Sequence, residues 1–268
     1  MHDQRPIGIF DSGLGGLTVA AALQEQLPNE SLCYLGDTAR VPYGNKSADV
    51  VKRYAQHCAH FLCKKDIKLL VVACNTASAY GLEHLRQTLD LPVIGVVHAG
   101  AALALETSHS KIIGVIGTRA TVNSQRYEEV LAKFDNTTQI KAVNCPLLVP
   151  LAEEGMIKHP LTEGILREYL SAFAQHPMDT LILGCTHYPL FQQEIKEIVG
   201  KEINVINSAQ AVAQSVRMAL KEKNLLSADS HESHHRFYAT DSVEEFKRVG
   251  ERFLGKELKH VEHVDLAT

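Results

Sequence analysis

The sequence predicts an α/β protein built from two pseudo-symmetric α/β domains with mainly parallel sheets. Short, almost continuously apolar runs alternate with amphipathic stretches along the chain, and segments of the first half recur in the second half. Continuous apolar runs are typical of parallel strands covered on both faces, and their alternation with helices is typical of βαβ units. Because two related domains meet at one interface, we expect the active site in the cleft between them.

The apolar runs place the expected strands. They lie at Ile7–Phe10, Leu32–Leu35, Leu69–Ala73, Val93–Val97, Ile112–Ile116, Ile140–Val143, Leu181–Leu183, Val205–Ile206 and Phe237–Ala239. Between them, residues 50–62 carry apolar side chains at three- and four-residue spacing, which predicts an amphipathic helix. Another helix is expected from Ala209 to Leu226. Ser242 and Glu245 form a capping-box pattern, which predicts the start of a last helix that ends near Leu254.

An internal repeat relates the two halves of the chain. The segment Ile7–Gly13 resembles Ile113–Arg119, which lies 106 positions later. The segment Leu70–Thr76 resembles Ile182–His187 when both are aligned on their cysteines, which are 111 positions apart. Two segments that repeat at nearly the same offset predict a duplicated unit. The tail has no third copy to belong to, and we expect it to pack back onto the first domain.

Composition excludes several classes of protein. The 268 residues include 27 basic and 31 acidic side chains, a formal net charge of -4, whereas nucleic-acid binding calls for a strongly basic face. No apolar run approaches the roughly 20 residues that span a bilayer, and no signal-like segment precedes the first expected strand. Six irregularly spaced cysteines do not form a disulfide scaffold. We therefore expect a cytoplasmic protein without nucleic-acid or membrane partners.

Small polar residues follow four of the expected strands. They form the groups Asp11-Ser12-Gly13, Asp37-Thr38, Cys74-Asn75-Thr76 and Cys185-Thr186-His187. In open parallel sheets, ligands bind outside the carboxyl ends of the strands, beside the amino ends of the following helices. The amide donors there favour negative charge, so we expect a lowered pKa and partial thiolate at Cys74 and Cys185. The other four cysteines are expected to be ordinary packing residues.

Two equivalent thiols from two related domains suit a reaction that inverts a carbon centre. One thiolate removes a proton from one face while the opposite thiol delivers a proton to the other face, and the roles exchange in reverse. The donors expected to hold substrate carboxylates are Ser12, Asn75, Thr76 and Thr186. His187 is placed to tune Cys185 or to donate to developing charge. Asp11 is placed to bind an ammonium group or to orient a neighbouring donor.

Other kinds of site fit the residues less well. A dinucleotide fingerprint would need glycine where Thr18 stands. Cys74, Cys185 and His187 match no common zinc spacing, so no metal ligand is assigned. The His-rich segment 227–235, with its cluster at 231–235, is typical of a solvated connection. A single cysteine nucleophile would leave the second cysteine unexplained. A non-catalytic, two-domain amino-acid-binding module stays open as an alternative.

Seven motifs, spread over essentially the whole chain, identify a family. They are Ile9–Leu17, Tyr34–Gly44, Ala73–Ser78, Gly117–Thr121, Pro146–Gly155, Gly184–Leu190 and Phe237–Asp241. The motifs resemble those of the glutamate racemase family, two-cysteine enzymes of the cofactor-independent aspartate/glutamate racemase superfamily. The Cys-Asn-Thr and Cys-Thr-His pair in this order is highly specific. Together with the repeat, this resemblance implies a first domain over 1–97 plus 208–268 and a second over 98–207.

The resemblance also implies the activity, an interconversion of L- and D-glutamate without any cofactor that supplies D-glutamate for peptidoglycan. Cys74 would be the base toward D-glutamate and Cys185 the base toward L-glutamate. The implied auxiliary residues are Asp11, Asp37, Glu153 and His187. The implied substrate contacts are Asp11, Ser12, Tyr43, Gly44, Asn75, Thr76, Thr121, Thr186 and His187. Aspartate or another amino acid is the alternative substrate, and a homodimer is an expectation that these motifs leave open.

Overall fold

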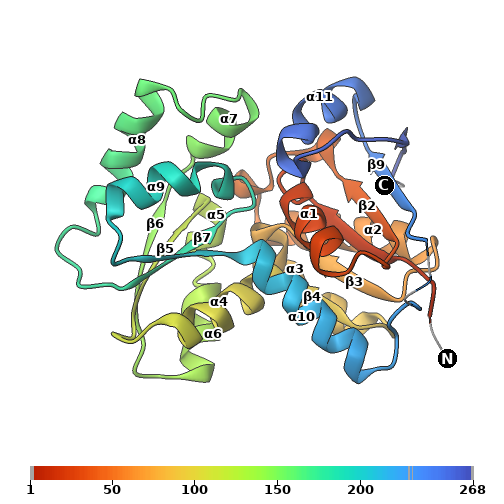
Figure 1. The fold of residues 1–268 in the computed structure, drawn as a ribbon, viewed down its shortest axis with the longest axis horizontal. Helices are drawn as coiled ribbons and strands as arrows, with labels where there is room; N and C mark the ends of the chain where they lie inside the picture. The colour runs from red at the N-terminus through yellow and green to blue at the C-terminus, as the bar shows by residue number, and fades with distance from the viewer. Residues whose placement is uncertain (1–2, 229, 231, 267–268) are drawn as a thin grey trace.

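The chain folds into an α/β structure with two parallel sheets (Figure 1). The computed structural model describes residues 3–228, 230 and 232–266. All the strand pairs within these residues are parallel, as the long apolar runs predicted. The predicted fold class is therefore confirmed. In the same part of the chain, no helix is both long and apolar enough to cross a membrane.

The first sheet has six strands, with β1 near its centre. In spatial order they are β10 (Val261–His263), β9 (His235–Ala239), β2 (Leu32–Gly36), β1 (Ile7–Asp11), β3 (Leu69–Val72) and β4 (Val93–Gly95). Every residue of β1 is buried, because β2 and β3 pair with its two edges and the flanking helices cover its faces.

The second sheet has four strands. In spatial order they are β6 (Gln139–Asn144), β5 (Ile112–Gly117), β7 (Thr180–Gly184) and β8 (Asn204–Asn207). The interior strands β5 and β7 are buried, as predicted. The prediction of a buried strand at Ile140–Val143 is wrong in its burial, because β6 is an edge strand that pairs only with β5 and stays partly exposed.

Helices connect the strands and cover both sheets (Figure 1). They are α1 (Leu17–Gln26), α2 (Ala48–Cys63), α3 (Asn75–Thr88), α4 (Val96–Thr107), α5 (Arg119–Asn123), α6 (Arg126–Phe134), α7 (Leu148–Glu153), α8 (Pro160–Ser171), α9 (Gln192–Val199), α10 (Ser208–Glu222) and α11 (Val243–Leu254). Short 3-10 helices are η1 (Thr38–Arg40), η2 (Tyr43–Asn45) and η3 (Tyr188–Phe191). The predicted helix over Ala209–Leu226 ends earlier, at Glu222, and Asn224 then takes a positive φ that stops it.

The tail after α10 joins the first sheet. Strand β9 pairs with β2, and β10 adds a further strand that was not predicted because Val261 is its only apolar residue. The predicted cap of α11 is confirmed, since the Ser242 hydroxyl accepts the Glu245 N–H at 3.2 Å. The predicted solvated connection is wrong at Ser227, which is buried against Glu30. His231, in the predicted His-rich cluster, lies outside the described residues.

The pairing of the strands supports the proposed division into 1–97 plus 208–268 and 98–207. Strands β1 to β4 share the first sheet with the tail strands β9 and β10, and β5 to β8 form the second sheet. Helix α10 follows the last strand of the second sheet and packs against both α1 and α4. The exact boundaries stay a proposal.

A buried ion pair fastens the tail to the first sheet. The Lys68 ammonium lies 2.5 Å from the Glu30 carboxylate, and both side chains are almost fully buried. The same ammonium donates to the backbone carbonyls of Asp3 and Leu225, at 2.6 and 2.8 Å. Glu30 also accepts the N–H and the hydroxyl of Ser227. The charged pair therefore joins the amino-terminal segment to the start of the tail.

Replacing Lys68 with methionine is expected to lower the free energy of unfolding by about 3–5 kcal/mol, because Glu30 would be left as an unpaired buried charge. Urea unfolding followed by circular dichroism measures the loss. The double variant Lys68→Met/Glu30→Gln should recover part of it, since no buried charge then remains. A single variant as stable as the unchanged protein would contradict this account of the pair.

Candidate active site

Cys74 and Cys185 line one cavity of about 330 Å³, although they follow strands of different sheets. Cys74 caps the amino end of α3 just after β3, and Cys185 follows the last residue of β7. The other lining residues are Ser12, Val41, Pro42, Tyr43, Gly44, Asn45, Asn75, Thr76, Thr118, Arg119, Pro146, Val149, Pro150, Glu153, Thr186 and His187. A cavity of this size suits a small-molecule ligand.

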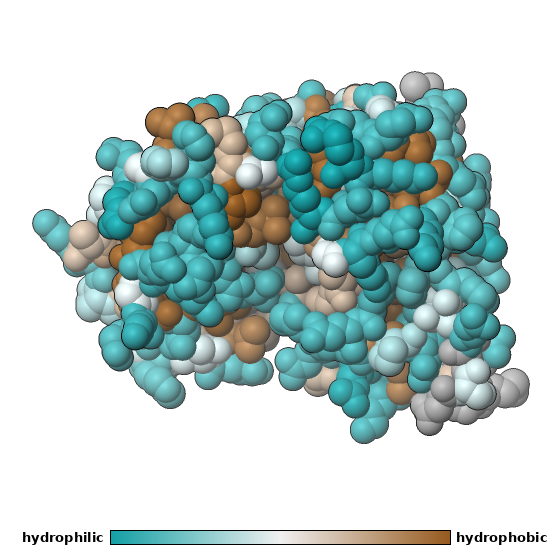
Figure 2. Space-filling view, turned by 45° about the horizontal axis from the view of Figure 1, so that its top comes forward, coloured by the Kyte–Doolittle hydropathy of each residue, from teal (hydrophilic) through white to brown (hydrophobic). Residues whose placement is uncertain are grey.

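The cavity combines polar groups at its strand ends with apolar walls. Hydrophobic surface is visible in the hollow between the two halves of the molecule (Figure 2). The apolar side chains that line the cavity are Val41, Pro42, Pro146, Val149 and Pro150. Such walls exclude water and strengthen the electrostatic interactions of any ligand held between them.

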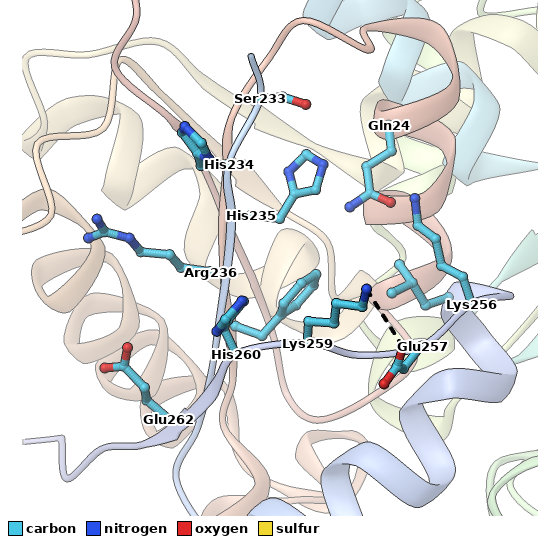
Figure 3. A pocket seen from close by; sticks show the side chains of 12 residues that line it. Gln24, Ser233, His234, His235, Arg236, Lys256, Glu257, Lys259, His260 and Glu262 are labelled. Carbon is cyan, nitrogen blue, oxygen red and sulfur yellow. Dashed lines mark ion pairs between the residues drawn. The ribbon is translucent and has the colours of Figure 1, made fainter.

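A larger cavity of about 810 Å³ lies beside β9 and the end of α11 (Figure 3). Its lining includes Gln24, His235 and Lys256, and one of its lysines, Lys259, is already ion-paired with Glu257 at 3.8 Å. Neither of the two strand-end cysteines lines it. Volume alone would point to this cavity, but the predicted chemical groups converge on the smaller one.

Burial and charge set the state of Cys74. Its sulfur lies 3.5 Å from the Ser12 hydroxyl and accepts the Ala77 N–H at 3.5 Å. Burial, with the nearby Asp11 carboxylate adding to it, raises the pKa of the Cys74 thiol to about 12. The prediction of a lowered pKa is therefore wrong for Cys74, because the Ala77 N–H at the helix start and the contact with Ser12 do not offset the loss of water.

Cys185 has a different neighbour, the imidazole of His187. The Nδ1 atom of His187 lies 3.8 Å from the Cys185 sulfur, and its Nε2 atom lies 2.9 Å from Glu153 Oε1. Burial lowers the pKa of His187, but its hydrogen bonds to Cys185 and Glu153 outweigh that effect and raise the pKa to about 10. An imidazolium at this position would place a positive charge beside the Cys185 sulfur.

Asp11 is completely buried and is not among the lining residues. Its Oδ2 atom accepts the Gly13 N–H at 3.0 Å, which holds the turn that carries Ser12. Burial raises the pKa of Asp11 despite the charge of His187 and the amide donors around it. Of the two predicted roles, these contacts favour the orientation of a neighbouring donor over a direct contact with an ammonium group.

Asp37 lies behind the cavity rather than on its surface. Its carboxylate accepts hydrogen bonds from the Tyr43 hydroxyl, from Arg40 Nε at 2.9 Å and from the Thr240 hydroxyl at 3.1 Å. Tyr43 and Gly44 do line the cavity, as predicted for substrate contacts. Asp37 therefore holds the loop that presents them.

Thr118 occupies the position at which a contact from Thr121 was predicted. Thr121 is buried away from the cavity surface and is 3.0 Å from the Thr118 hydroxyl and 3.2 Å from that of Thr76. Thr118 and Arg119 line the cavity and were not singled out from the sequence. The repeat contained the signal, since Thr118 stands 106 positions after Ser12, the hydroxyl that follows β1.

Asn75 carries a donor that is free for a ligand. Its Oδ1 atom accepts the Tyr127 hydroxyl at 2.8 Å, which fixes the orientation of the amide. Its Nδ2 atom is buried and makes no hydrogen bond within the described part of the chain. Because a buried donor without a partner is costly, a ligand oxygen in the cavity would satisfy it.

Comparison with known proteins agrees with this arrangement. A family model described as Asp/Glu/Hydantoin racemase matches residues 16–216. A glutamate racemase of Geobacter metallireducens is 46% identical over 262 residues, which cover 98% of this chain and 97% of the relative. The chain belongs to the glutamate racemase family. The family predicted from the sequence motifs is thus confirmed.

Solved structures of glutamate racemases share the fold along its whole length. The RacE1 isoform from Bacillus anthracis is 40% identical, with a TM-score of 0.95 and 99% of both chains covered. The Francisella tularensis glutamate racemase, solved in complex with D-glutamate, is 38% identical with a TM-score of 0.92 and 98% of both chains covered.

Removing the charge of Glu153 is expected to lower the pKa of His187 by at least about one unit, because an opposite charge within hydrogen-bond distance typically shifts a pKa by 1–3 units. NMR titration of the His187 ring in Glu153→Gln measures this shift. Glu154→Gln, which removes a charge one residue further along, is the control and should leave the titration unchanged. An unaltered His187 titration in Glu153→Gln would show that the carboxylate does not hold the imidazolium.

Proposed function

We propose that this chain interconverts L- and D-glutamate by two-base proton transfer at the α-carbon, with Cys74 and Cys185 as the two bases. The observation that carries the proposal is the presence of both thiols on one small cavity, each at the end of a strand from a different sheet. Membership of the glutamate racemase family and the D-glutamate complex of the Francisella tularensis relative support the choice of substrate.

In the direction from L to D, the Cys185 thiolate takes the α-proton and the Cys74 thiol gives a proton to the opposite face. One C–H bond breaks and another forms, so the enzyme exchanges a proton between its two sulfurs in each turnover. His187 keeps positive charge beside Cys185, and the raised pKa of Cys74 keeps that thiol protonated and ready to donate. This arrangement suits the direction from L to D, in which Cys74 is the acid.

In the reverse direction Cys74 must first lose its proton. A bound α-ammonium group would bring a positive charge into the cavity, where it would favour the Cys74 thiolate. The substrate carboxylates would accept hydrogen bonds from the strand-end donors around the two thiols. These donors are Ser12, Asn75, Thr76, Thr118 and Thr186, with the Tyr43–Gly44 loop closing one side.

The wider role follows from the product and the family. D-Glutamate is used in bacterial peptidoglycan, and we assign this chain to its supply in the cytoplasm. The six described cysteines are all free, which is consistent with a reducing compartment. A homodimer stays a prediction of the family resemblance, and light scattering coupled to size-exclusion chromatography tests it.

Cys74→Ser and Cys185→Ser are each expected to lower racemisation of glutamate by at least about 100-fold, because each removes a group that must both accept and donate the transferred proton. Polarimetry and deuterium incorporation in deuterated water, without added cofactor, measure the loss. Cys63→Ser, which changes a half-buried thiol at the end of α2, should keep the full rate.

Full racemase activity in either Cys74→Ser or Cys185→Ser would overturn the two-base mechanism. Racemisation of aspartate but not of glutamate would overturn the choice of substrate and leave the mechanism standing.

A further inference from the structure

The last turn of α11 contacts both members of the His187–Glu153 pair. Helix α11 belongs to the tail, while Glu153 ends α7, and the two helices lie side by side (Figure 1). The Phe253 ring meets the His187 ring edge-on, with centroids 5.0 Å apart and an interplanar angle of 76°. The Arg252 guanidinium donates to the backbone carbonyl of Glu153 at 3.0 Å.

The Arg252 contact caps the carboxyl end of α7. The last carbonyls of a helix have no partner within it, and an arginine side chain satisfies them well because its charge also complements the helix dipole. Gly155 leaves the room for this contact, since a Cβ atom at that position would lie 2.6 Å from Arg252 Nη1. Gly155 is the last residue of the Pro146–Gly155 motif. The guanidinium beside it explains why a residue without a side chain stands at this position.

Helix α11 is itself firmly anchored on the first sheet's side. Its buried face, which includes Phe246 and Val249, packs against α1. Gly250 allows this close approach, because a Cβ atom there would lie 2.8 Å from Leu17 and 2.7 Å from Leu258. A rigid helix of the tail therefore carries Arg252 and Phe253 to the side of the cavity where Cys185 lies.

No corresponding contact of Arg252 or Phe253 reaches the surroundings of Cys74 within the described residues. Cys74 is flanked by Ser12 and Asp11 and by the start of α3. We infer that Arg252 and Phe253 are positioning residues for Cys185 more than for Cys74, acting through Glu153 and through His187. The His187 ring contacts the Cys185 sulfur directly and acts on Cys74 through the charge it exerts on Asp11. This inference rests on the proposed function, in which each thiol deprotonates one enantiomer.

Racemisation of glutamate cannot separate the two thiols, because an equilibrium constant of one forces both directions to lose kcat/KM equally. Elimination from β-chloroglutamate does separate them, when the L and D substrates are the two mirror-image forms of a single diastereomer. One thiolate removes the α-proton, the C–H electrons form a Cα–Cβ double bond, and chloride leaves, so no reprotonation by the second thiol is needed. Cys185 would act on the L enantiomer and Cys74 on the D enantiomer.

Arg252→Ala is expected to lower kcat/KM for chloride release from the L enantiomer by about fivefold, the scale of one ordinary hydrogen bond. The D enantiomer should react within about twofold of the unchanged rate. Arg252→Lys should restore most of the loss, since an ammonium group also donates to the Glu153 carbonyl. Phe253→Leu is a second variant with the same expected selectivity.

Arg248→Ala is the matched control, because Arg248 lies on the same helix and is ion-paired with Glu245 at the exposed surface. It should leave both enantiomers unaffected. Equal losses for the two enantiomers in Arg252→Ala and Phe253→Leu would overturn the inference and assign the contact to closure of the cavity as a whole. No loss with either variant would also overturn it. An unchanged protein that racemises no glutamate would instead overturn the proposed function and, with it, this inference.

Discussion

Two thiols from separate sheets line one cavity of about 330 Å³, so the two sheets must be held in a fixed arrangement on either side of it. Hydrogen bonds between the halves keep the sheets in place around it. The Tyr127 hydroxyl donates to Asn75, the Tyr80 hydroxyl donates to the Ala120 carbonyl at 3.0 Å, and the Thr76 and Thr118 hydroxyls are 3.1 Å apart. All three bonds join α3, which follows β3, to the segment from Thr118 to Tyr127, which follows β5 and contains α5 and the start of α6.

The duplicated backbone carries two thiols in unlike surroundings. Cys74 has a buried carboxyl group near it and a pKa of about 12, whereas Cys185 has an imidazole backed by a carboxylate. Two-base transfer needs one proton shared between the two sulfurs, and coupled groups can share a proton whether or not their surroundings match. The unlike surroundings therefore bear on which of the two sulfurs holds that proton in the free enzyme.

Apolar runs predicted the strands other than β10, and strand-end polarity predicted seven of the eighteen residues that line the cavity, because burial and the carboxyl ends of parallel strands are dictated locally. Tyr43, Gly44 and Glu153 were predicted from the family resemblance instead. Tertiary effects escaped prediction. The pKa of Cys74 depends on its burial in the folded chain, and the partial exposure of β6 depends on its being an edge strand. The family resemblance implied a substrate contact from Thr121, whereas Thr118, which the 106-residue repeat aligns with Ser12, lines the cavity.

The tail accounts for differences between the two repeated halves of the chain. It has no counterpart in the repeat, and its strands β9 and β10 extend the first sheet to six strands while the second keeps four. From this added edge the Thr240 hydroxyl supports Asp37 behind the Tyr43 loop, and α11 reaches Glu153 and the His187 ring. Duplication therefore supplies the two thiols. The unduplicated tail supplies contacts that differ between them, and under the proposed mechanism these contacts help to distinguish the base that acts on L-glutamate from the base that acts on D-glutamate.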